Sequence, residues 1–279
     1  MTDTNQPTQT NTTIITGASD GIGAEMARQL ARAHGSSAAL VLAARNAALL
    51  AAVAAQCEAL GARVLVVPTD VSEHAQCRAL VEQTVRTFGR VDTLINNAGI
   101  SAQALFSEVK AEDLGWYEQL MRVNLWGSVW CTHAALPYLK ASRGRIVAVS
   151  SLAGLIALPG RTAYSTSKFA MTGFFEALRT ELQSAGVTVT TAFPGVVLTN
   201  IRTRGLNAAG QTAGSSGLKE DKAMGVEECA RHILAGMEQR QREVLMTPQG
   251  KVARWLKLLA PRMVDRMALA ALKDEVKPR

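Results

Sequence analysis

The chain has 279 residues, of which 48% are hydrophobic and 19% are charged, so it can bury one large core and is not a disordered protein. Its four cysteines and four histidines show no Cys-x-x-Cys, His-x-x-x-His or Glu-x-x-His spacing, which indicates neither a disulfide framework nor a metal site. The net charge of +7 arises mainly in residues 248–279, which contain eight Lys or Arg against three Asp or Glu. The rest of the chain is nearly balanced and shows no pattern of basic residues interleaved with aromatic ones, so nucleic-acid binding is not expected.

In chain order, residues 1–11 come first; they are polar and lack the features of a signal peptide, so we expect a disordered N-terminus on a cytoplasmic protein. From residue 12 to residue 247, apolar or β-branched runs alternate with segments of helical period, which predicts one α/β domain. Runs that are apolar throughout favour a parallel sheet with helices on both faces, the doubly wound Rossmann-type arrangement, which binds ligands beyond the carboxyl ends of its strands. The seven predicted strands are Thr12–Thr16, Ala38–Ala44, Arg63–Val67, Asp92–Asn96, Arg145–Ser150, Val187–Phe193 and Glu243–Met246.

The first predicted strand runs into a glycine-rich turn, Gly17 to Gly23, and then into a helix. Glycines there would allow a tight turn and a close approach of a pyrophosphate to the amides of the helix N-terminus, where the dipole favours an anion. The spacing, three residues and then one between glycines, differs from the commoner Gly-x-Gly-x-x-Gly fingerprint. Taken alone, such a turn can also be purely structural.

Tyr164 and Lys168 are four residues apart on a predicted helix, so their side chains share one face. A free phenol titrates near pH ~10, and a fixed positive neighbour that favours the phenolate would bring its proton within reach of catalysis. The pair alone is weak evidence. It gains weight from the glycine turn, from Asn96-Asn97-Ala98-Gly99, and from Ser151, thirteen residues before the tyrosine.

Together these motifs resemble the short-chain dehydrogenase/reductase family over about residues 12–247. The resemblance implies a nicotinamide dinucleotide held by the first turn, with adenine near Asp70 and Val71 and the nicotinamide carboxamide near Val197 and Thr199. The matching motifs are Thr16-Gly17-x-x-x-Gly21-x-Gly23, Asp70-Val71, Asn96-Asn97-Ala98-Gly99, Asn124, Ser151, Tyr164-x-x-x-Lys168 and Pro194-Gly195. The cofactor-binding residues expected in this way are Gly17, Ser19, Asp20, Gly21, Ile22, Gly23, Arg45, Asp70, Val71, Asn97, Ala98, Gly99, Tyr164, Lys168, Pro194, Gly195, Val197 and Thr199.

The resemblance also implies a reaction, in which nicotinamide delivers hydride to a carbonyl carbon while Tyr164 donates a proton to its oxygen, with both steps reversing in alcohol oxidation. Lys168 would favour the tyrosinate and bind the nicotinamide ribose, and Ser151 would orient the substrate oxygen. Asn124 would hold a water that leads protons to the lysine, or would simply be a polar residue that bends its helix. The expected catalytic residues are therefore Tyr164, Lys168, Ser151 and Asn124.

The end of the second predicted strand bears on the form of the cofactor. An acidic residue there would bind both adenine-ribose hydroxyls and repel a 2′-phosphate, whereas this chain has Ala44 followed by Arg45. A guanidinium fits a phosphate, so NADP(H) is favoured over NAD(H), although Arg45 could also be a solvated charge at a helix start. Many family members that use NADP carry a basic residue in the first turn, where this chain has Asp20.

Residues 200–224 are rich in Gly and follow the sixth predicted strand, so we expect a substrate lid, with a plain surface loop as the alternative. The other candidate lining residues are mostly apolar, which favours a hydrophobic carbonyl compound or secondary alcohol as substrate, although each could equally belong to the core. These residues are Ser101 to Phe106, Leu152, Leu155, Leu158 and Pro159.

Residues 248–279 read as a basic, amphipathic helical extension interrupted at Pro261. Its apolar face is expected to pack on its own subunit or on a second one, with membrane-surface contact as the less favoured alternative. The resemblance implies subunits paired through helices, so we expect a homodimer or homotetramer. The aromatic residues that could cover such an interface, or belong to the core, are Trp126, Trp130, Phe174 and Phe175.

These observations predict an NADP(H)-dependent carbonyl reductase or alcohol dehydrogenase that acts on a small molecule. A non-catalytic dinucleotide-binding regulatory protein is the alternative, but it should lack Tyr164, Lys168 or Ser151, and all three are present. A sugar-nucleotide epimerase is disfavoured by the spacing of the first turn and by the length of the chain.

Overall fold

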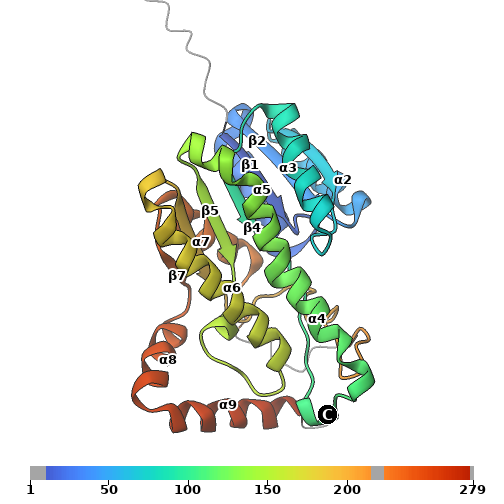
Figure 1. Cartoon of the computed structure of the whole chain (residues 1–279), viewed down its shortest axis with the longest axis vertical. Helices are drawn as coiled ribbons and strands as arrows, with labels where there is room; N and C mark the ends of the chain where they lie inside the picture. Colours follow the sequence, from blue (N-terminus) through green and yellow to red (C-terminus); the bar gives the residue numbers. More distant parts are fainter. Residues whose placement is uncertain (1–10, 215–222, 277–279) are drawn as a thin grey trace, which may run out of the picture.

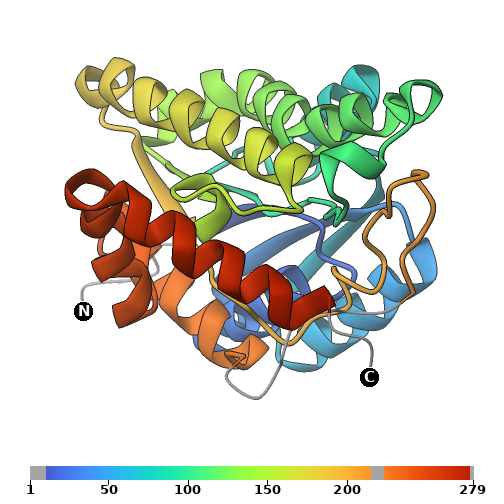
Figure 2. The same ribbon diagram turned by 90° about the horizontal axis from the view of Figure 1, so that it is seen from below.

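The computed structural model describes residues 11–214 and 223–276, which form a parallel sheet between two layers of helices (Figures 1 and 2). The sheet has seven strands in the order β3-β2-β1-β4-β5-β6-β7, which confirms the predicted doubly wound arrangement. The strand order reverses between β1 and β4, where such sheets open their ligand-binding crevice. The strands are β1 (Asn11–Thr16), β2 (Ala38–Ala44), β3 (Arg63–Pro68), β4 (Thr93–Asn96), β5 (Arg145–Val149), β6 (Thr188–Phe193) and β7 (Glu243–Leu245).

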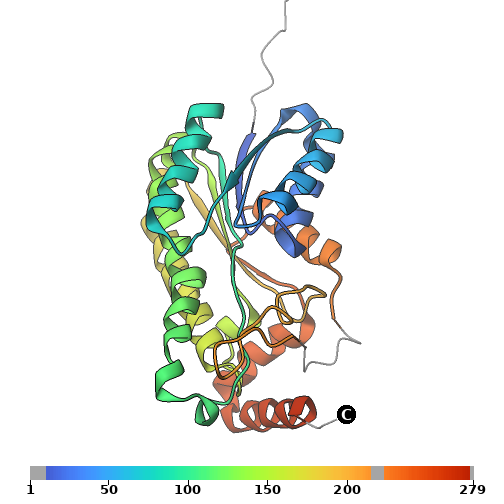
Figure 3. The same cartoon turned by 90° about the vertical axis from the view of Figure 1, so that its right-hand side faces the viewer.

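The helices cover both faces of the sheet, as Figure 3 shows from the side. One face carries α1 (Gly21–His34), α2 (Ala47–Ala59) and α7 (Val226–Glu238), and the other carries α3 (His74–Phe88), α5 (Gly127–Ser142) and α6 (Thr162–Glu181). The remaining helical segments are η1 (Gly35–Ser37), η2 (Phe106–Glu108), η3 (Ala111–Asp113), α4 (Gly115–Met121), the π-helical turn η4 (Arg122–Trp126), η5 (Leu152–Gly154), η6 (Gln183–Ala185), α8 (Pro248–Leu259) and α9 (Pro261–Val276).

Alternation along the strands explains why they are apolar throughout. Successive side chains of a strand point to opposite faces, so both faces must be apolar when helices cover both. Ile15 accordingly packs with the residues of α1, α2 and α7, whereas its neighbour Ile14 packs with those of α3, α5 and α6. Both side chains are fully buried.

All seven predicted strands are present, each within one residue at either end. β4 begins at Thr93 instead of Asp92, whose carboxylate accepts a hydrogen bond from the Thr12 amide at 2.9 Å and pairs with Arg90 at 2.6 Å. β5 ends before Ser150, whose hydroxyl donates to the Lys168 carbonyl at 3.3 Å. Both polar side chains thus make hydrogen bonds at the ends of the strands, outside the regular pairing of the sheet.

The four aromatic residues considered for a subunit interface divide between core and surface. The Phe175 side chain is fully buried in this chain, so for it the core alternative is correct, and Phe174 packs edge-on against it with ring centroids 4.9 Å apart. Trp126 is 45% exposed and stacks on Trp130 at 5.9 Å. Trp126 is therefore the most exposed of the four, Trp130 and Phe174 are partly buried, and Phe175 belongs to the core.

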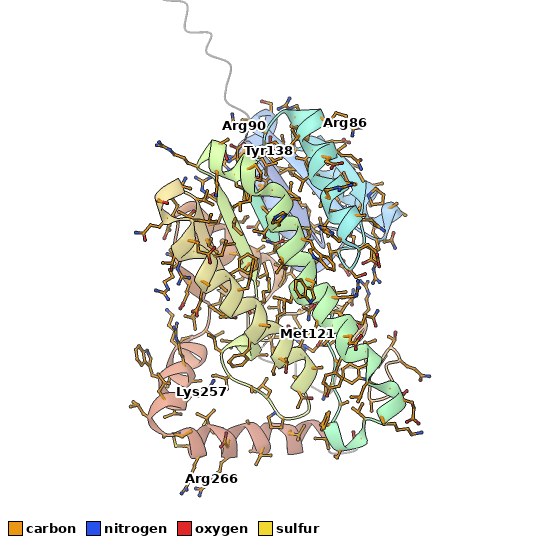
Figure 4. The ribbon with its side chains drawn as sticks, viewed as in Figure 1. Arg86, Arg90, Met121, Tyr138, Lys257 and Arg266 are labelled. Atoms are coloured by element: carbon orange, nitrogen blue, oxygen red, sulfur yellow. The ribbon has the colours of Figure 1, made fainter. Side chains whose placement is uncertain are left out.

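The C-terminal extension forms two helices at the lower edge of the molecule, where α9 runs across the end of the domain (Figures 1 and 3). Arg254 of α8 pairs with Glu243 of β7, and the Lys257 ammonium donates to the Leu155 carbonyl at 2.9 Å. Figure 4 labels Lys257 on the inner side of α8 and Arg266 pointing away from the molecule. None of the helices within residues 11–214 and 223–276 is long and apolar enough to cross a bilayer.

Candidate active site

The glycine turn after β1 has the geometry that a close phosphate contact needs. Gly17 and Gly21 have φ of 68° and 54°, in the left-handed region that favours glycine. A Cβ on Gly17 would lie 2.9 Å from the Ala98 Cα, so only glycine allows the turn to approach the end of β4 so closely. The side chain of Asp20 caps α1 by accepting a hydrogen bond from the Gly21 amide at 2.7 Å.

Asn97 ties this turn to the central strand. Its side-chain amide donates to the carbonyls of Thr16 and Gly17, at 3.0 and 3.2 Å. The Thr16 hydroxyl in turn accepts hydrogen bonds from the backbone amides of Asn97 and Ala98, at 3.0 and 3.1 Å. These bonds fix the two strand ends on either side of the point where the strand order reverses.

A cleft of about 840 Å³ opens beyond the carboxyl ends of β1 to β4. Many of the predicted cofactor-binding residues, from separate parts of the sequence, line this one cleft. They are Gly17, Ser19, Asp20, Gly21, Ile22, Arg45, Asp70, Val71, Asn97, Ala98, Gly99 and Thr199. Residues on the wall that the sequence did not single out include Asn46, Asn200 and Arg204.

Other predicted cofactor residues lie beside the cleft and not on its wall. Gly23 packs against Gly17 and Asn97, since a Cβ there would collide with both, so its role is to let α1 approach the turn. Gly195 faces Leu152, and Val197 is only 5% exposed. The remaining members of this group are Pro194, Tyr164 and Lys168.

Lys168 lies where α6 meets the cleft. Its ammonium is 5.9 Å from the centroid of the Tyr164 ring, donates to the Val149 carbonyl at 2.9 Å, and would be 3.6 Å from a Cβ on Gly99, which lines the cleft. The two predicted catalytic groups thus face one region, as their spacing requires. Burial lowers the pKa of Lys168 from 10.5 to about 8.

The acidity of Tyr164 does not follow the expectation from Lys168 alone. Burial raises its pKa above the ordinary value, while a hydrogen bond from Ser151 and the charges of Arg161 and Arg202 act to lower it. The Lys168 ammonium, 5.9 Å from the ring centroid of Tyr164, is directed at the Val149 carbonyl. The role expected of Lys168, to favour the tyrosinate beside a bound cofactor, stays a prediction.

Asn124 lies in the π-helical turn η4 and is fully buried. The side-chain oxygen Oδ1 of Asn124 accepts a hydrogen bond from the backbone amide of Ile100 at 2.8 Å. The side-chain nitrogen Nδ2 donates to the Ile100 carbonyl and to the Ser167 hydroxyl, both at 2.9 Å. Asn124 therefore holds the segment after β4 against α6, next to Lys168. The place of Asn124 in a π-helical turn fits the alternative of a polar residue that bends its helix. The role of holding a water stays a prediction.

The described part of the predicted lid, residues 200–214 and 223–224, is more ordered than its glycine content indicates. Leu206 pairs with the segment after β4 through its amide, which donates to the Ser101 carbonyl at 2.9 Å, and through its carbonyl, which accepts from Gln103 at 2.8 Å. The Trp116 indole donates to the Ala208 carbonyl at 3.2 Å. Part of the predicted lid, residues 215–222, lies outside the described residues.

Comparison with known proteins agrees with this geometry. A family model described as short chain dehydrogenase matches residues 11–208. The chain is 37% identical to 11-beta-hydroxysteroid dehydrogenase A of Sesamum indicum over 259 residues, covering 90% of this chain and 72% of that protein. It is 38% identical to 11-beta-hydroxysteroid dehydrogenase-like 4A of Arabidopsis thaliana over 252 residues, covering 90% and 81%.

Two solved structures share the fold. A short chain dehydrogenase/reductase from Burkholderia phymatum in complex with NAD superposes with a TM-score of 0.77 at 27% identity, covering 91% of this chain and 95% of that one. An alcohol dehydrogenase from the archaeon Thermococcus sibiricus, complexed with 5-hydroxy-NADP, gives 0.73 at 25% identity, covering 85% and 96%. The non-catalytic alternative is not supported, because the matching family model and the similar proteins are those of dehydrogenases. The chain belongs to the short-chain dehydrogenase/reductase family and is an NAD(P)-dependent oxidoreductase.

Proposed function

We propose that the protein is an NADP(H)-dependent carbonyl reductase or alcohol dehydrogenase whose substrate is a hydrophobic carbonyl compound or secondary alcohol. The observation that carries this proposal is the meeting of Tyr164, Ser151 and Lys168 beside a cleft with a glycine turn. The cleft residues fit a dinucleotide, because a cleft of about 840 Å³ opens over the glycine turn that leads into α1, and a helix N-terminus favours phosphates. When bound, the nicotinamide supplies or accepts the hydride.

The protein's own residues would supply the proton and the orientation. Tyr164 donates a proton to the substrate oxygen in reduction and accepts it in oxidation. Ser151, whose hydroxyl acts to lower the pKa of Tyr164, orients that oxygen. Lys168 keeps its ammonium at the edge of the cleft, where it can bind ribose hydroxyls, and Asn124 positions the neighbouring segment of the cleft wall.

The preference for NADP(H) is supported by Arg45, which lines the cleft directly after β2 and is exposed. A guanidinium there can bind a 2′-phosphate, and Ala44 offers no carboxylate to the ribose hydroxyls. The related structures carry both kinds of cofactor, NAD and an NADP derivative. Initial rates with NADPH and NADH test this preference, and an equal or higher kcat/KM with NADH contradicts it.

The substrate class is supported by the apolar cluster in which Tyr164 packs, with Ala102, Trp116 and Leu206, and by the printed names of the relatives. Those relatives are hydroxysteroid dehydrogenases and, among the structures, an alcohol dehydrogenase. A panel of steroids, aliphatic ketones and aromatic aldehydes, matched with small polar carbonyls, tests the proposal. Preference for the polar members would reject a hydrophobic substrate.

Replacing Tyr164 by Phe tests the chemistry itself. Loss of the general acid should lower kcat/KM roughly 10²- to 10⁴-fold, while the dissociation constant of the cofactor stays within a few-fold. Oxidation of NADPH followed by absorbance gives the rate, and Tyr138→Phe, which changes an exposed phenol on α5, is the matched control. Normal turnover by Tyr164→Phe would reject the proposed mechanism.

We also propose a homodimer or homotetramer. Support comes from the stacked Trp126 and Trp130 and from the C-terminal helices, whose apolar side chains are largely exposed in the single chain. A second copy would bury this surface, whereas contact with a membrane surface is the alternative.

A further inference from the structure

Asp20 joins the glycine turn to the segment that follows β6. Its Oδ2 accepts a hydrogen bond from the Asn200 side-chain amide at 3.1 Å and lies 3.0 Å from Nη2 of Arg204. Asn200 is 180 residues away in the sequence, so these contacts close the chain across one end of the cleft. A Cβ on Gly21 would be 3.2 Å from the Thr199 methyl group, which places the same segment directly over the turn.

The contacts keep Asp20 charged. Burial acts to raise the pKa of Asp20, but the hydrogen bonds from Asn200 and Gly21 and the charge of Arg204 bring it below the ordinary value. Asp20 therefore carries a full negative charge at neutral pH, at the place where the cofactor's phosphates approach the chain. Without a partner, this charge would oppose the binding of any additional phosphate.

The charged side chains on the cleft wall are two acids and two arginines: Asp20, Asp70, Arg45 and Arg204. The Asp70 carboxylate is already engaged by the amide and the hydroxyl of Ser72, at 2.9 and 2.7 Å. Arg204 compensates Asp20, so among the described residues of this wall no acid without a partner opposes the positive charge of Arg45. The net field in the cleft thus depends on Arg204, a residue far from Arg45 in the sequence.

We propose that Arg204 is a specificity-determining residue of the cofactor cleft, because its ion pair with Asp20 cancels the acidic charge of the glycine turn and thereby permits a cofactor with a 2′-phosphate. This inference rests on the proposed use of NADP(H). It assigns to the loop after β6 a role in cofactor choice, in addition to its position near the substrate. Arg204 lines the cleft and 59% of its side chain is exposed, so its guanidinium also adds to the positive charge that phosphates meet.

A double-mutant cycle tests the ion pair directly. The dissociation constants of NADPH and NADH are measured by titration calorimetry for the wild type, Arg204→Gln, Asp20→Asn and the double variant. Arg204→Gln should weaken NADPH roughly tenfold more than NADH, because the Asp20 charge is then exposed to the 2′-phosphate. In the double variant the charge is gone, so the NADPH/NADH ratio should return to within a few-fold of the wild-type ratio.

Two controls separate charge from structure. Arg204→Lys keeps the charge and should keep most of the preference, and Arg86→Gln removes an exposed cation from α3, far from the cleft, and should leave the ratio unchanged. Melting temperatures without cofactor report any general loss of stability. Added salt should shrink the effect of Arg204→Gln, since a screened charge repels less.

The possible failures are distinguishable. If the wild type prefers NADPH and Arg204→Gln weakens both cofactors equally, with no recovery in the double variant, Arg204 only holds the loop and the inference is wrong, while the proposed function stands. If the wild type binds NADH more tightly than NADPH, the proposed cofactor preference is wrong and the inference falls with it.

Discussion

The environment of Tyr164 contains more positive charge than its pairing with Lys168 supplies. Arg161, the residue that precedes α6, lies three residues before Tyr164, and only 8% of it is exposed. The Arg161 guanidinium donates to the side-chain oxygen of Gln103 at 3.0 Å, a neutral partner that leaves its charge intact. Arg202, from the segment after β6, acts on the tyrosine in the same direction. Two arginines thus oppose the effect of burial on the phenol.

Arg161→Met should therefore make Tyr164 a weaker acid. Loss of the guanidinium raises the pKa of Tyr164 further, so the rise of kcat/KM for alcohol oxidation, which needs the phenolate, should move to higher pH. The groups facing the phenol in the described structure include Lys168, Ser151 and Arg202. The profile is measured in parallel for Arg86→Met, a remote exposed control. An unshifted midpoint with a lower plateau would mean that Arg161 acts only by holding Gln103.

Lys168 should make stability rise with pH over a defined window. Burial depresses its pKa from 10.5 to about 8, so between these values the unfolded chain binds more protons than the folded one. The penalty is complete below pH 8 and is relieved as the pH rises toward 10.5. Relative to Lys168→Met, the wild type should gain on the order of 2–3 kcal/mol across this window. Urea unfolding at several pH values measures the difference, and parallel curves would contradict a depressed pKa.

At the scale of elements, two helical glycines should respond to alanine in opposite ways. A Cβ on Gly127, at the start of α5, would lie 2.8 Å from Val71, whose side chain lines the cleft, so Gly127→Ala should cost roughly 1–3 kcal/mol and weaken cofactor binding. Gly173, inside α6, has nothing within 4 Å of its Cβ position, so Gly173→Ala should stabilise by roughly 0.5–1 kcal/mol. Denaturant unfolding compares the two, and equal effects would disprove the close approach at Gly127.

The elements were predictable because each strand is read from a local pattern. A buried parallel strand must be apolar on both faces, and the sequence of β2, Ala38–Ala44, has no polar residue to obscure this. The ends were less certain, since Asp92 and Ser150 use their side chains in contacts that no local pattern contains. Phe175 resembles an interface residue in the sequence, and only the packing of α6 on the sheet shows that it is core.

The site was predictable to the extent that motifs carry it. The glycine turn, Asn97 and the Tyr164–Lys168 pair have spacings fixed by the chemistry, and the structure places them around one cleft. The contact between Asp20 and Arg204 joins residues far apart in the chain, with no motif around the arginine. The effect of Arg202 on Tyr164 was also hidden, because only the tertiary structure brings the segment after β6 near the tyrosine.

At the scale of the whole molecule, the C-terminal helices connect the substrate end to the surface. The Lys257 ammonium of α8 donates a hydrogen bond to the Leu155 carbonyl. The Leu272 side chain of α9 lies 3.2 Å from where a Cβ on Gly160, in the loop before α6, would be. These contacts reach the segment between Ser151 and Tyr164 and leave the cofactor cleft untouched. The inner face of the extension is thus bound to its own chain, while its outer face exposes apolar side chains of α8 together with charged ones such as Arg266 of α9.

That outer face should determine the oligomeric state. Trp255, Leu258 and Leu259 are 64%, 69% and 82% exposed in the single chain. Large exposed apolar residues that are close together mark an interaction surface. If a second copy covers it, Trp255→Glu combined with Leu259→Glu should shift the protein to a smaller species in light scattering after size exclusion, with cofactor affinity preserved. Arg266→Glu, an exposed change on α9, should leave the assembly intact. An unchanged mass, together with loss of flotation on anionic liposomes in the double variant, would instead assign this face to a membrane surface.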